Sequence, residues 1–305
     1  MWQAEHIREA LLASHEGLTV EIEIIRTKGD IALEAPLYKM LDKGLFTTEI
    51  QNALLDGSID VAVHSLKDLP TEKVEGLSLA AVPERVDPAD VLVTKGARAL
   101  DELAQGARVL TGSLRRRAQI LAIRPDLEVL PVRGNVDTRL RKFSESNAQS
   151  IVFAAAGLIR LGLADRVTQR LEPIAFLPAC GQGALGIEIK SENTFAAEAV
   201  NVLDDFPSRA TATAERAFLA ALGGGCQAPV GAYGRFVADN ELCLTGMAAA
   251  LDGSKIMKME ASATVDSRDA AAALGEQLAL ILLEGGCREI LDQARAAQQQ
   301  LGESQ

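Results

Sequence analysis

A short apolar segment at residues 59–63 is followed directly by side chains that can carry out chemistry. These are His64, Ser65, Lys67 and Asp68. The segment is typical of a buried parallel strand, and α/β folds bind ligands at the carboxyl ends of such strands. A carboxylate beside an ammonium group there can act as a tuned acid or base, or can stabilise a cation. A polar turn in which Asp68 caps the next segment explains the same residues, and the pattern alone does not choose between the two.

Arginines follow three later strand candidates. Residues 111–117 (Thr-Gly-Ser-Leu-Arg-Arg-Arg) leave a strand and open a helix, where backbone N–H groups at Gly112 and Ser113 can bind an anion. Arginine also donates paired hydrogen bonds to a carboxylate or a phosphate. Solvated helix faces would explain isolated arginines, but recurrence at successive strand ends favours one pocket for a polyanion, either phosphate or polycarboxylate. The candidate donors are Arg115 and Arg116, then Arg133 and Arg139, then Arg160.

Two glycine-rich loops are candidates of a different kind. Cys226 lies in the loop 223–230 (Gly-Gly-Gly-Cys-Gln-Ala-Pro-Val), but the preceding helix ends there, so no helix dipole activates the thiol. From the residues alone, a small buried cysteine in a tight turn is the simpler interpretation. The loop at residues 177–184 lacks the Lys-Ser/Thr of a phosphate-binding loop, so we interpret it as a hinge between domains.

The composition narrows the class of protein. The chain has 305 residues, 48% hydrophobic and 24% charged, as expected of a globular protein with two or three domains. Its net charge of −11 argues against general nucleic-acid binding, and four scattered cysteines with three histidines argue against a zinc site. No apolar run approaches the ~18 residues of a membrane span, and the first residues lack the apolar core of a signal peptide. We therefore expect a cytoplasmic location.

Hydrophobic periodicity predicts three successive units. The first two alternate strands with helices and are α/β, and the third is a small α+β unit. The predicted strands are 18–25, 59–63, 77–82, 91–93, 108–110, 127–132, 150–155, 185–190, 242–248 and 255–264. The predicted helices are 1–13, 46–55, 114–123, 136–144, 158–161, 194–203, 210–222, 270–283 and 288–298.

Taken in order, these segments resemble hydroxymethylbilane synthase (porphobilinogen deaminase) from residue 2 to about residue 290. The resemblance implies two α/β domains similar to type II periplasmic binding proteins and a small α+β C-terminal domain. It places these domains at residues 1–84 with 184–203, at 88–178 and at 206–305. The matching pieces are Lys43-Gly-Leu-Phe46, His64-Ser-Leu-Lys-Asp-Leu-Pro70, Gly112-Ser-Leu-Arg-Arg116, Arg133-Gly-Asn-Val136, Ala155-Ala-Gly-Leu158, Leu177-Pro178, Gly181-Gln-Gly183, Ala214-Glu-Arg216 and Gly224-Gly-Cys-Gln-Ala-Pro229.

The resemblance also implies a reaction. The family condenses four porphobilinogen molecules head to tail, releases ammonia each time, and frees hydroxymethylbilane by hydrolysis. The product grows on a dipyrromethane cofactor held by a thioether to a cysteine, here Cys226. Asp68 matches the catalytic aspartate, whose carboxylate can stabilise the cationic azafulvene that remains when ammonia leaves. The implied partner is this small-molecule substrate, with no nucleic acid and no membrane, and the implied state is a monomer.

The resemblance assigns binding roles as well. Every pyrrole has an acetate and a propionate, so the growing product is a polycarboxylate that the arginine pocket can neutralise. The residues implied to hold the cofactor are Lys67, Ser65, Ser113, Arg115, Arg116 and Gly112. Those implied to hold substrate are Arg133, Arg139, Arg160, Lys43 and Phe46. Because one site must hold a lengthening chain, we expect hinge motion near residues 84–88 and 177–183.

The resemblance fails at the beginning of the chain. The family starts with a strand carrying Thr-Arg-x-Ser, just before the Trp-Gln-Ala that stands here at residues 2–4, and this chain starts at Met1. Without that strand, the segment 18–25 loses its neighbour, and buried backbone groups left unpaired cost about 1–3 kcal/mol each. A misassigned start, a truncation and a natural loss all explain the difference, and the upstream genomic sequence would distinguish them.

Other functions remain open at this point. A non-catalytic anion-binding protein with a periplasmic-binding-protein-like fold would need neither Asp68 nor Cys226. A phosphate-handling enzyme would use the same arginines, but the sequence has no evident acidic cluster for Mg²⁺. An inactive, truncated member of the family is a further alternative.

Overall fold

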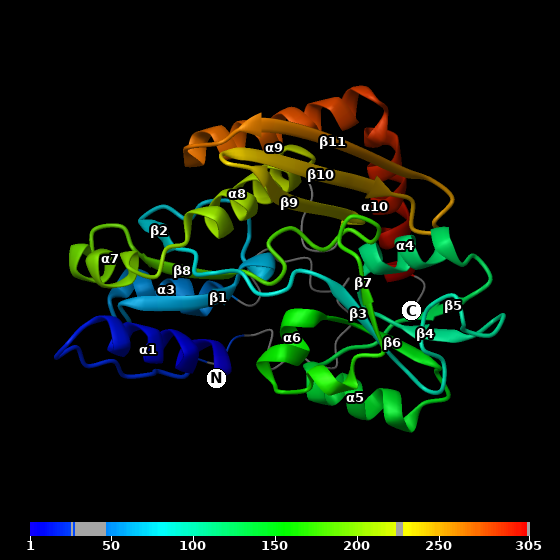
Figure 1. Ribbon diagram of the computed structural model, residues 1–305, viewed down its shortest axis with the longest axis horizontal. Helices are drawn as coiled ribbons and strands as arrows, with labels where there is room; N and C mark the ends of the chain where they lie inside the picture. The colour runs from blue at the N-terminus through cyan, green and yellow to red at the C-terminus, as the bar shows by residue number, and fades with distance from the viewer. Residues whose placement is uncertain (26, 28–46, 224–227, 304–305) are drawn as a thin grey trace.

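The computed structural model describes residues 1–25, 27, 47–223 and 228–303, and their strands form three separate sheets (Figure 1). Each sheet has its own helices, and the three resulting units are named here in chain order. The prediction of mixed α/β structure followed by an α+β unit is confirmed.

The first unit is built on a sheet with the strand order β1-β8-β2. Both neighbours of β8 run antiparallel to it, with Val63 opposite Ile187 and Leu79 opposite Glu188. Apolar side chains of the sheet and helices share one core, in which Ile187 and Val200 are fully buried. The strands are β1 (Val61–Ser65), β2 (Leu77–Ala81) and β8 (Leu185–Lys190), and the helices are α1 (Trp2–Ser14), α3 (Thr48–Asp56) and α7 (Thr194–Asn201).

Two predictions for the first unit are wrong. The strand predicted at residues 59–63 exists as β1, but it is antiparallel to its neighbour. The side chains of β1 are buried or partly buried, and this gives the segment its apolar character. From the sequence alone, such a strand cannot be distinguished from a buried parallel strand. Residues 18–25 form neither helix nor strand, although Leu18, Val20 and Ile22 are still partly buried while the residues between them are exposed. The alternation of apolar and polar residues therefore indicates that one side of the segment is buried. It does not by itself indicate a strand, because a strand also needs a hydrogen-bonded neighbour.

The second unit is a five-stranded sheet with the order β5-β4-β6-β3-β7. Strand β4 is parallel to β5 and β6, whereas β3 is antiparallel to both β6 and β7. Successive residues point to opposite faces, so Val91 and Leu92 lie in two different cores. The elements are β3 (Asp90–Thr94), β4 (Arg108–Leu110), β5 (Glu128–Leu130), β6 (Ser150–Ala154), β7 (Gln169–Leu171), α4 (Leu114–Ile123), α5 (Val136–Glu145), α6 (Ala155–Arg160) and the 3-10 turn Ala164–Arg166.

The third unit is an antiparallel meander, β11-β10-β9, packed on helices. A Cβ added to Gly275 of α9 would lie 2.2 Å from the carbonyl oxygen of Ala214 in α8, so only glycine permits this close helix contact. Strand β9 was not predicted, because two glycines and an arginine weaken its strand pattern. The elements are α8 (Phe206–Ala221), β9 (Val230–Ala238), β10 (Glu241–Ala249), β11 (Ile256–Thr264), α9 (Arg268–Glu284) and α10 (Cys287–Glu303).

Within the described part of the chain, no single helix is long and apolar enough to cross a membrane. The bent pair Arg268–Glu284 and Cys287–Ala296, which meet at 84°, satisfies length and composition together. In α9, however, Leu274, Leu278 and Leu282 are buried in the core of the third unit.

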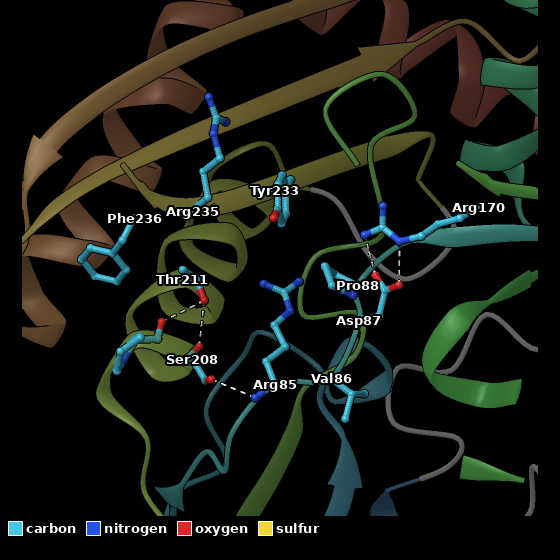
Figure 2. A pocket seen from close by; sticks show the side chains of 12 residues that line it. Arg85, Val86, Asp87, Pro88, Arg170, Ser208, Thr211, Tyr233, Arg235 and Phe236 are labelled. Atoms are coloured by element: carbon cyan, nitrogen blue, oxygen red, sulfur yellow. Dashed lines mark hydrogen bonds and ion pairs between the residues drawn. The ribbon is translucent and has the colours of Figure 1, made fainter. Parts of the chain in front are cut away.

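A buried carboxylate on α8 joins all three units. Glu215 is fully buried and accepts two hydrogen bonds from Arg85, at 2.7 and 3.0 Å, in the connection between the first two units. It also accepts the backbone N–H of Gly181, at 2.7 Å, in the return connection, and that of Gly234, at 2.9 Å, in β9. Beside this contact, the backbone N–H of Arg85 donates to Ser208 Oγ at 2.8 Å (Figure 2). One side chain thus fixes both connections against the third unit.

Replacing Glu215 should therefore destabilise the whole chain. Glu215→Gln leaves Arg85 buried without its counter-charge, so we expect a loss of about 3–5 kcal/mol in the free energy of unfolding. Urea denaturation measures this loss. Glu128→Gln is the control, because its partner Arg108 and Glu128 itself are 41% and 48% exposed, and breaking that pair should cost at most about 1 kcal/mol. Equal losses in the two variants would contradict the role of Glu215.

Candidate active site

The arginine-bearing strand ends lie at one edge of the second sheet. Strands β5, β4 and β6 are mutually parallel neighbours, so their carboxyl ends share that edge (Figure 1). Arg115 and Arg116 follow β4 in α4, Arg139 follows β5 in α5, and Arg160 ends α6 after β6. The predicted grouping of strand ends is therefore confirmed for these three strands.

Arg115 and Arg116 are bound to an internal carboxylate that the sequence analysis did not single out. Asp90, the fully buried first residue of β3, accepts from Arg115 Nη1 at 2.7 Å and from Arg116 Nε and Nη2 at 3.0 and 2.7 Å. Gln182 Nε2 donates to the same carboxylate at 2.8 Å. Burial alone would raise the pKa of Asp90, but the two guanidinium groups outweigh burial and hold the pKa well below its ordinary value. Two cations against one anion leave net positive charge at this edge.

The turn that carries Asp68 faces these arginines. Strand β1 ends at Ser65 and continues into a 3-10 turn, Leu66–Asp68. Leu66 is fully buried and its N–H donates to Ala184 O at 3.0 Å, whereas Asp68 is exposed. Burial lowers the pKa of the Lys67 ammonium, and the charge of Asp68 offsets part of that effect. The buried backbone thus fixes the turn and leaves the carboxylate of Asp68 open for chemistry.

Arg139 connects this turn electrostatically to the second unit. Burial lowers the pKa of Arg139, the charges of Arg116 and Arg133 lower it further, and Asp68 raises it. Since charge interactions of this kind act over short distances, residues far apart in the sequence share one site. Lys67 likewise interacts with the charges of Arg115 and Arg116.

Two arginines at this edge have buried donors without acceptors. Among the described residues, the Nε atoms of Arg139 and Arg160 are buried and have no hydrogen-bond partner. Arg160 Nη2 donates to Gly183 O at 2.9 Å, so the side chain is held in place while its Nε is left over. A buried donor without a partner costs about 1–3 kcal/mol, and such donors fit a carboxylate or phosphate ligand.

The hydroxyl and glycine candidates have local structural roles. Ser113 Oγ accepts the N–H of Arg116 at 3.4 Å as the N-cap of α4, and the N–H of Ser113 donates to Thr111 Oγ1 at 3.2 Å. The prediction that the N–H of Ser113 is available for an anion is therefore wrong, because the turn uses it. A Cβ on Gly112 would lie 2.7 Å from the carbonyl oxygen of Val132, so glycine lets two strand ends approach. Ser65 Oγ accepts from Gln3 Nε2 at 2.7 Å.

Several other predicted residues lie elsewhere than expected or outside the described part of the chain. His64 lies inside β1 rather than in the turn, with its Nε2 buried 2.9 Å from Glu188 Oε2. Lys43, Phe46 and Cys226 lie outside the described residues. The remaining cysteines are free and buried, and burial raises the pKa of each thiol, so all three are poor nucleophiles; they are Cys180, Cys243 and Cys287.

The connections predicted as hinges lie against each other. Arg85 Nε donates to Gln182 O at 2.9 Å, and Gln182 Nε2 donates to Pro88 O at 2.7 Å. Gln182 therefore contacts the other hinge connection and also the carboxylate of Asp90. Sequence reasoning missed Asp90 and Gln182; a charged residue at the start of an otherwise apolar strand was the available signal for Asp90.

A pocket lies at the junction of the three units and differs in character from this edge (Figure 2). It is lined by three arginines whose charges are already paired within the protein: Arg85 with Glu215, Arg170 with Asp87 and Glu172, and Arg235 with Glu260. Neither Asp68 nor Arg139 lines it. The edge with exposed Asp68 and buried unused donors is therefore the better candidate active site.

Residues 1–25, 27, 47–223 and 228–303 contain no group of three or more His, Cys, Asp or Glu side chains that could hold a metal ion. The edge is instead rich in cations, and the exposed carboxylate of Asp68 interacts with the charge of Arg139. Fold and site together define a multi-unit α/β protein with an exposed carboxylate beside a cation-rich edge that suits a polyanion.

Comparison with known proteins gives the family. Residues 1–198 match the family model described as "Porphobilinogen deaminase, dipyromethane cofactor binding domain", and residues 209–284 match "Porphobilinogen deaminase, C-terminal domain". The porphobilinogen deaminase of Nitratidesulfovibrio vulgaris Hildenborough is 46% identical over 299 residues, 97% of this chain and 94% of that protein. That of Desulforudis audaxviator is 49% identical over 294 residues, 96% of this chain and 94% of that protein. The chain belongs to the porphobilinogen deaminase family.

Solved structures of periplasmic binding proteins are also similar. The methionine-binding protein MetQ is 13% identical with a TM-score of 0.40, and the match covers 70% of this chain and 87% of that one. A likeness of this size says nothing about ligand or activity.

The burial of Asp90 between two arginines predicts how the free energy of unfolding depends on pH. Asp90→Asn leaves two buried guanidinium groups without a counter-charge and should cost about 3–5 kcal/mol of unfolding free energy at pH 7. Because the folded-state pKa is depressed, this stabilisation is present above the ordinary aspartate pKa of about 4 and is lost as pH falls below it. Urea denaturation of both proteins between about pH 7 and pH 3 measures the difference.

Asp87→Asn is the matched control, because Asp87 lies three positions before Asp90 and pairs with Arg170, whose side chain is 41% exposed. It should cost at most about 1 kcal/mol. A small effect of Asp90→Asn at pH 7, or one that grows as pH falls below about 4, would contradict the assignment of Asp90 as the buried counter-charge.

Proposed function

We propose that this chain is a hydroxymethylbilane synthase. It condenses four porphobilinogen molecules head to tail with release of ammonia, on a covalently bound dipyrromethane primer, and yields hydroxymethylbilane for tetrapyrrole (porphyrin and haem) biosynthesis. The observation that carries this proposal is the exposed carboxylate of Asp68 beside an arginine edge, where the buried Nε donors of Arg139 and Arg160 have no acceptor among the described residues. The family match supplies the identity of the substrate and the cofactor.

The described residues fit the dipyrromethane group. Each pyrrole has two carboxylates, and the Nε donors of Arg139 and Arg160 lack acceptors in the described part of the chain. When bound, dipyrromethane supplies the free pyrrole position to which substrate is joined. The family resemblance implies that Cys226 is its attachment point by thioether, and we propose it in that role. Burial raises the thiol pKa of Cys180, Cys243 and Cys287, which suits these three less well to such a bond.

Asp68 is proposed as the catalytic residue. Its carboxylate can accept hydrogen bonds from pyrrole N–H groups and stabilise the positive charge that develops as ammonia leaves the substrate. It can also take up the proton lost when the new carbon–carbon bond forms. Lys67, whose pKa is lowered by burial, lies next to it and can help to hold or move a proton.

The cations divide into two groups according to their contacts. Arg139 and Arg160 have buried donors for substrate or cofactor carboxylates, and Arg133 contributes charge beside Arg139. Arg115 and Arg116 are held by Asp90 and act on bound carboxylates mainly through the net positive charge of their cluster. Ser65, Ser113 and Gly112 shape the edges of the site, and Lys43 and Phe46 are proposed to contact substrate.

We further propose that the three units act as domains, at residues 1–84 with 184–203, 88–178 and 206–305. The connections at 84–88 and 177–183 would serve as hinges while the product lengthens. The enzyme is proposed to act on porphobilinogen as a cytoplasmic monomer. The contact of Gln182 with Arg85 and Pro88 supports joint movement of the two connections.

The covalent primer can be tested by intact mass. Purified protein should exceed its sequence mass by two pyrrole units, because the cofactor remains attached by a thioether. Cys226→Ser should show the sequence mass, and Cys243→Ser, which removes a buried free thiol, should keep the excess. An unmodified wild-type mass that persists after incubation with porphobilinogen or hydroxymethylbilane would refute the proposal.

The role of Asp68 can be tested by turnover. Asp68→Asn should lower kcat about 10²–10⁴-fold, the usual contribution of acid–base catalysis, while cofactor loading and unfolding free energy stay near wild type. Asp68→Glu should retain part of the activity, because the carboxylate is kept. Asp239→Asn, exposed in the turn after β9, is the control and should be fully active. A kcat within twofold of wild type for Asp68→Asn would remove Asp68 from the mechanism.

A further inference from the structure

Helix α8 holds the backbone of the Asp68 turn with one arginine. Arg216 Nη1 donates to the carbonyl oxygens of Leu66, at 3.1 Å, and Leu69, at 2.7 Å. Arg216 Nη2 donates to that of Pro70 at 2.7 Å. The three acceptors lie on both sides of Asp68 in the sequence, so the arginine clamps the segment that presents the carboxylate.

This clamp is physically suited to fixing a short turn. The carbonyl oxygen of Leu66 accepts the N–H of Leu69 at 3.3 Å within the turn, and the charged guanidinium adds strong hydrogen bonds to it and to the carbonyls that follow. The side chains of Leu66 and Leu69 are buried in a small core with Ala184 and Ala212, which secures the turn from the apolar side. Asp68 itself is exposed, so its position depends on the backbone beneath it.

The support of the clamp is itself rigid. Arg216 follows Glu215, whose buried carboxylate binds Arg85, Gly181 and Gly234. The same helix leads to Gly223, and Cys226 comes three residues later in the sequence. One helix therefore contacts the turn of the proposed catalytic carboxylate and precedes the proposed attachment point of the cofactor.

We propose that Arg216 is a positioning residue that sets the place of Asp68 relative to the third unit. This inference rests on the proposed function, because it assigns a task to Asp68. A purely structural role, holding two units together, would have the same contacts but no specific effect on turnover. A misplacement of about 1 Å in a reacting group can cost about 100-fold in rate, so even a partial release of the turn should be measurable.

The chain offers a matched control on the same helix. Arg209 also donates from α8 to backbone carbonyls of the first unit, with Nη1 3.2 Å from Leu79 O and Nη2 2.6 Å from Ala80 O. These acceptors belong to β2 and not to the Asp68 turn, although the side chain of Leu79 packs against the small core beneath that turn. Arg209→Gln and Arg216→Gln both remove contacts from a guanidinium to carbonyls of the first unit. Arg209→Gln also breaks the ion pair with Asp204, at 2.6 Å, and only Arg216→Gln removes contacts to the Asp68 turn.

The experiment compares Arg216→Gln, Arg216→Lys and Arg209→Gln in the full-length, cofactor-loaded protein. We expect Arg216→Gln to lower kcat about 10- to 100-fold with KM for porphobilinogen within about twofold, because binding groups remain in place. Arg216→Lys should recover part of kcat, since an ammonium can still bind some of the carbonyls. Arg209→Gln should lower the urea midpoint without lowering kcat.

Hydrogen exchange gives a second readout that does not depend on turnover. Peptides covering residues 66–70 should exchange faster in Arg216→Gln than in wild type or Arg209→Gln. Unchanged exchange there, or equal kcat losses in the two glutamine variants, would overturn the inference. If wild type itself does not convert porphobilinogen, the proposed function fails, and the exchange data alone then decide whether Arg216 positions the turn.

Discussion

The arrangement of the three units depends on a carboxylate that is kept charged out of contact with water. Glu215 is fully buried, and its two oxygens are used by Arg85 and by the backbone N–H groups of Gly181 and Gly234. Burying a charge is tolerable only when its partners replace the lost hydration, so all of these groups must be in place at once. Both connections between the first two units and the third sheet are thereby fixed at one point.

At the active-site edge, buried charges likewise need partners, but here the charges in excess are positive. Asp90 neutralises one of the two buried arginines of α4 and leaves one positive charge in excess. Arg139 and Arg160 add further cations whose Nε donors have no acceptor among the described residues, and the exposed carboxylate of Asp68 interacts with the charge of Arg139. A chain with a net charge of −11 can therefore still bind a polycarboxylate, because its cations are concentrated where three parallel strands end.

The site could be predicted from the sequence as far as strand ends determine it. Asp68 and Arg139 follow short apolar strands, and the parallel order of β5, β4 and β6 brings the arginines to one edge. What could not be predicted is which donors are used internally. Arg115 and Arg116 have the same local pattern as a ligand-binding pair, yet Asp90, about 25 positions earlier in the chain, occupies them. A local pattern contains no information on a partner so distant.

The sequence by itself determined the family, the class of fold, most helices and strands, and the chemical type of the site, because periodicity and motif spacing are local properties. The tertiary structure alone decided strand direction in the first sheet, the absence of a strand at residues 18–25, and the tasks of Asp90, Glu215 and Arg216. These depend on which segments meet in space. Hydrogen bonds and buried charges are satisfied between residues that the chain order keeps far apart, so their outcome is fixed only when the units pack together.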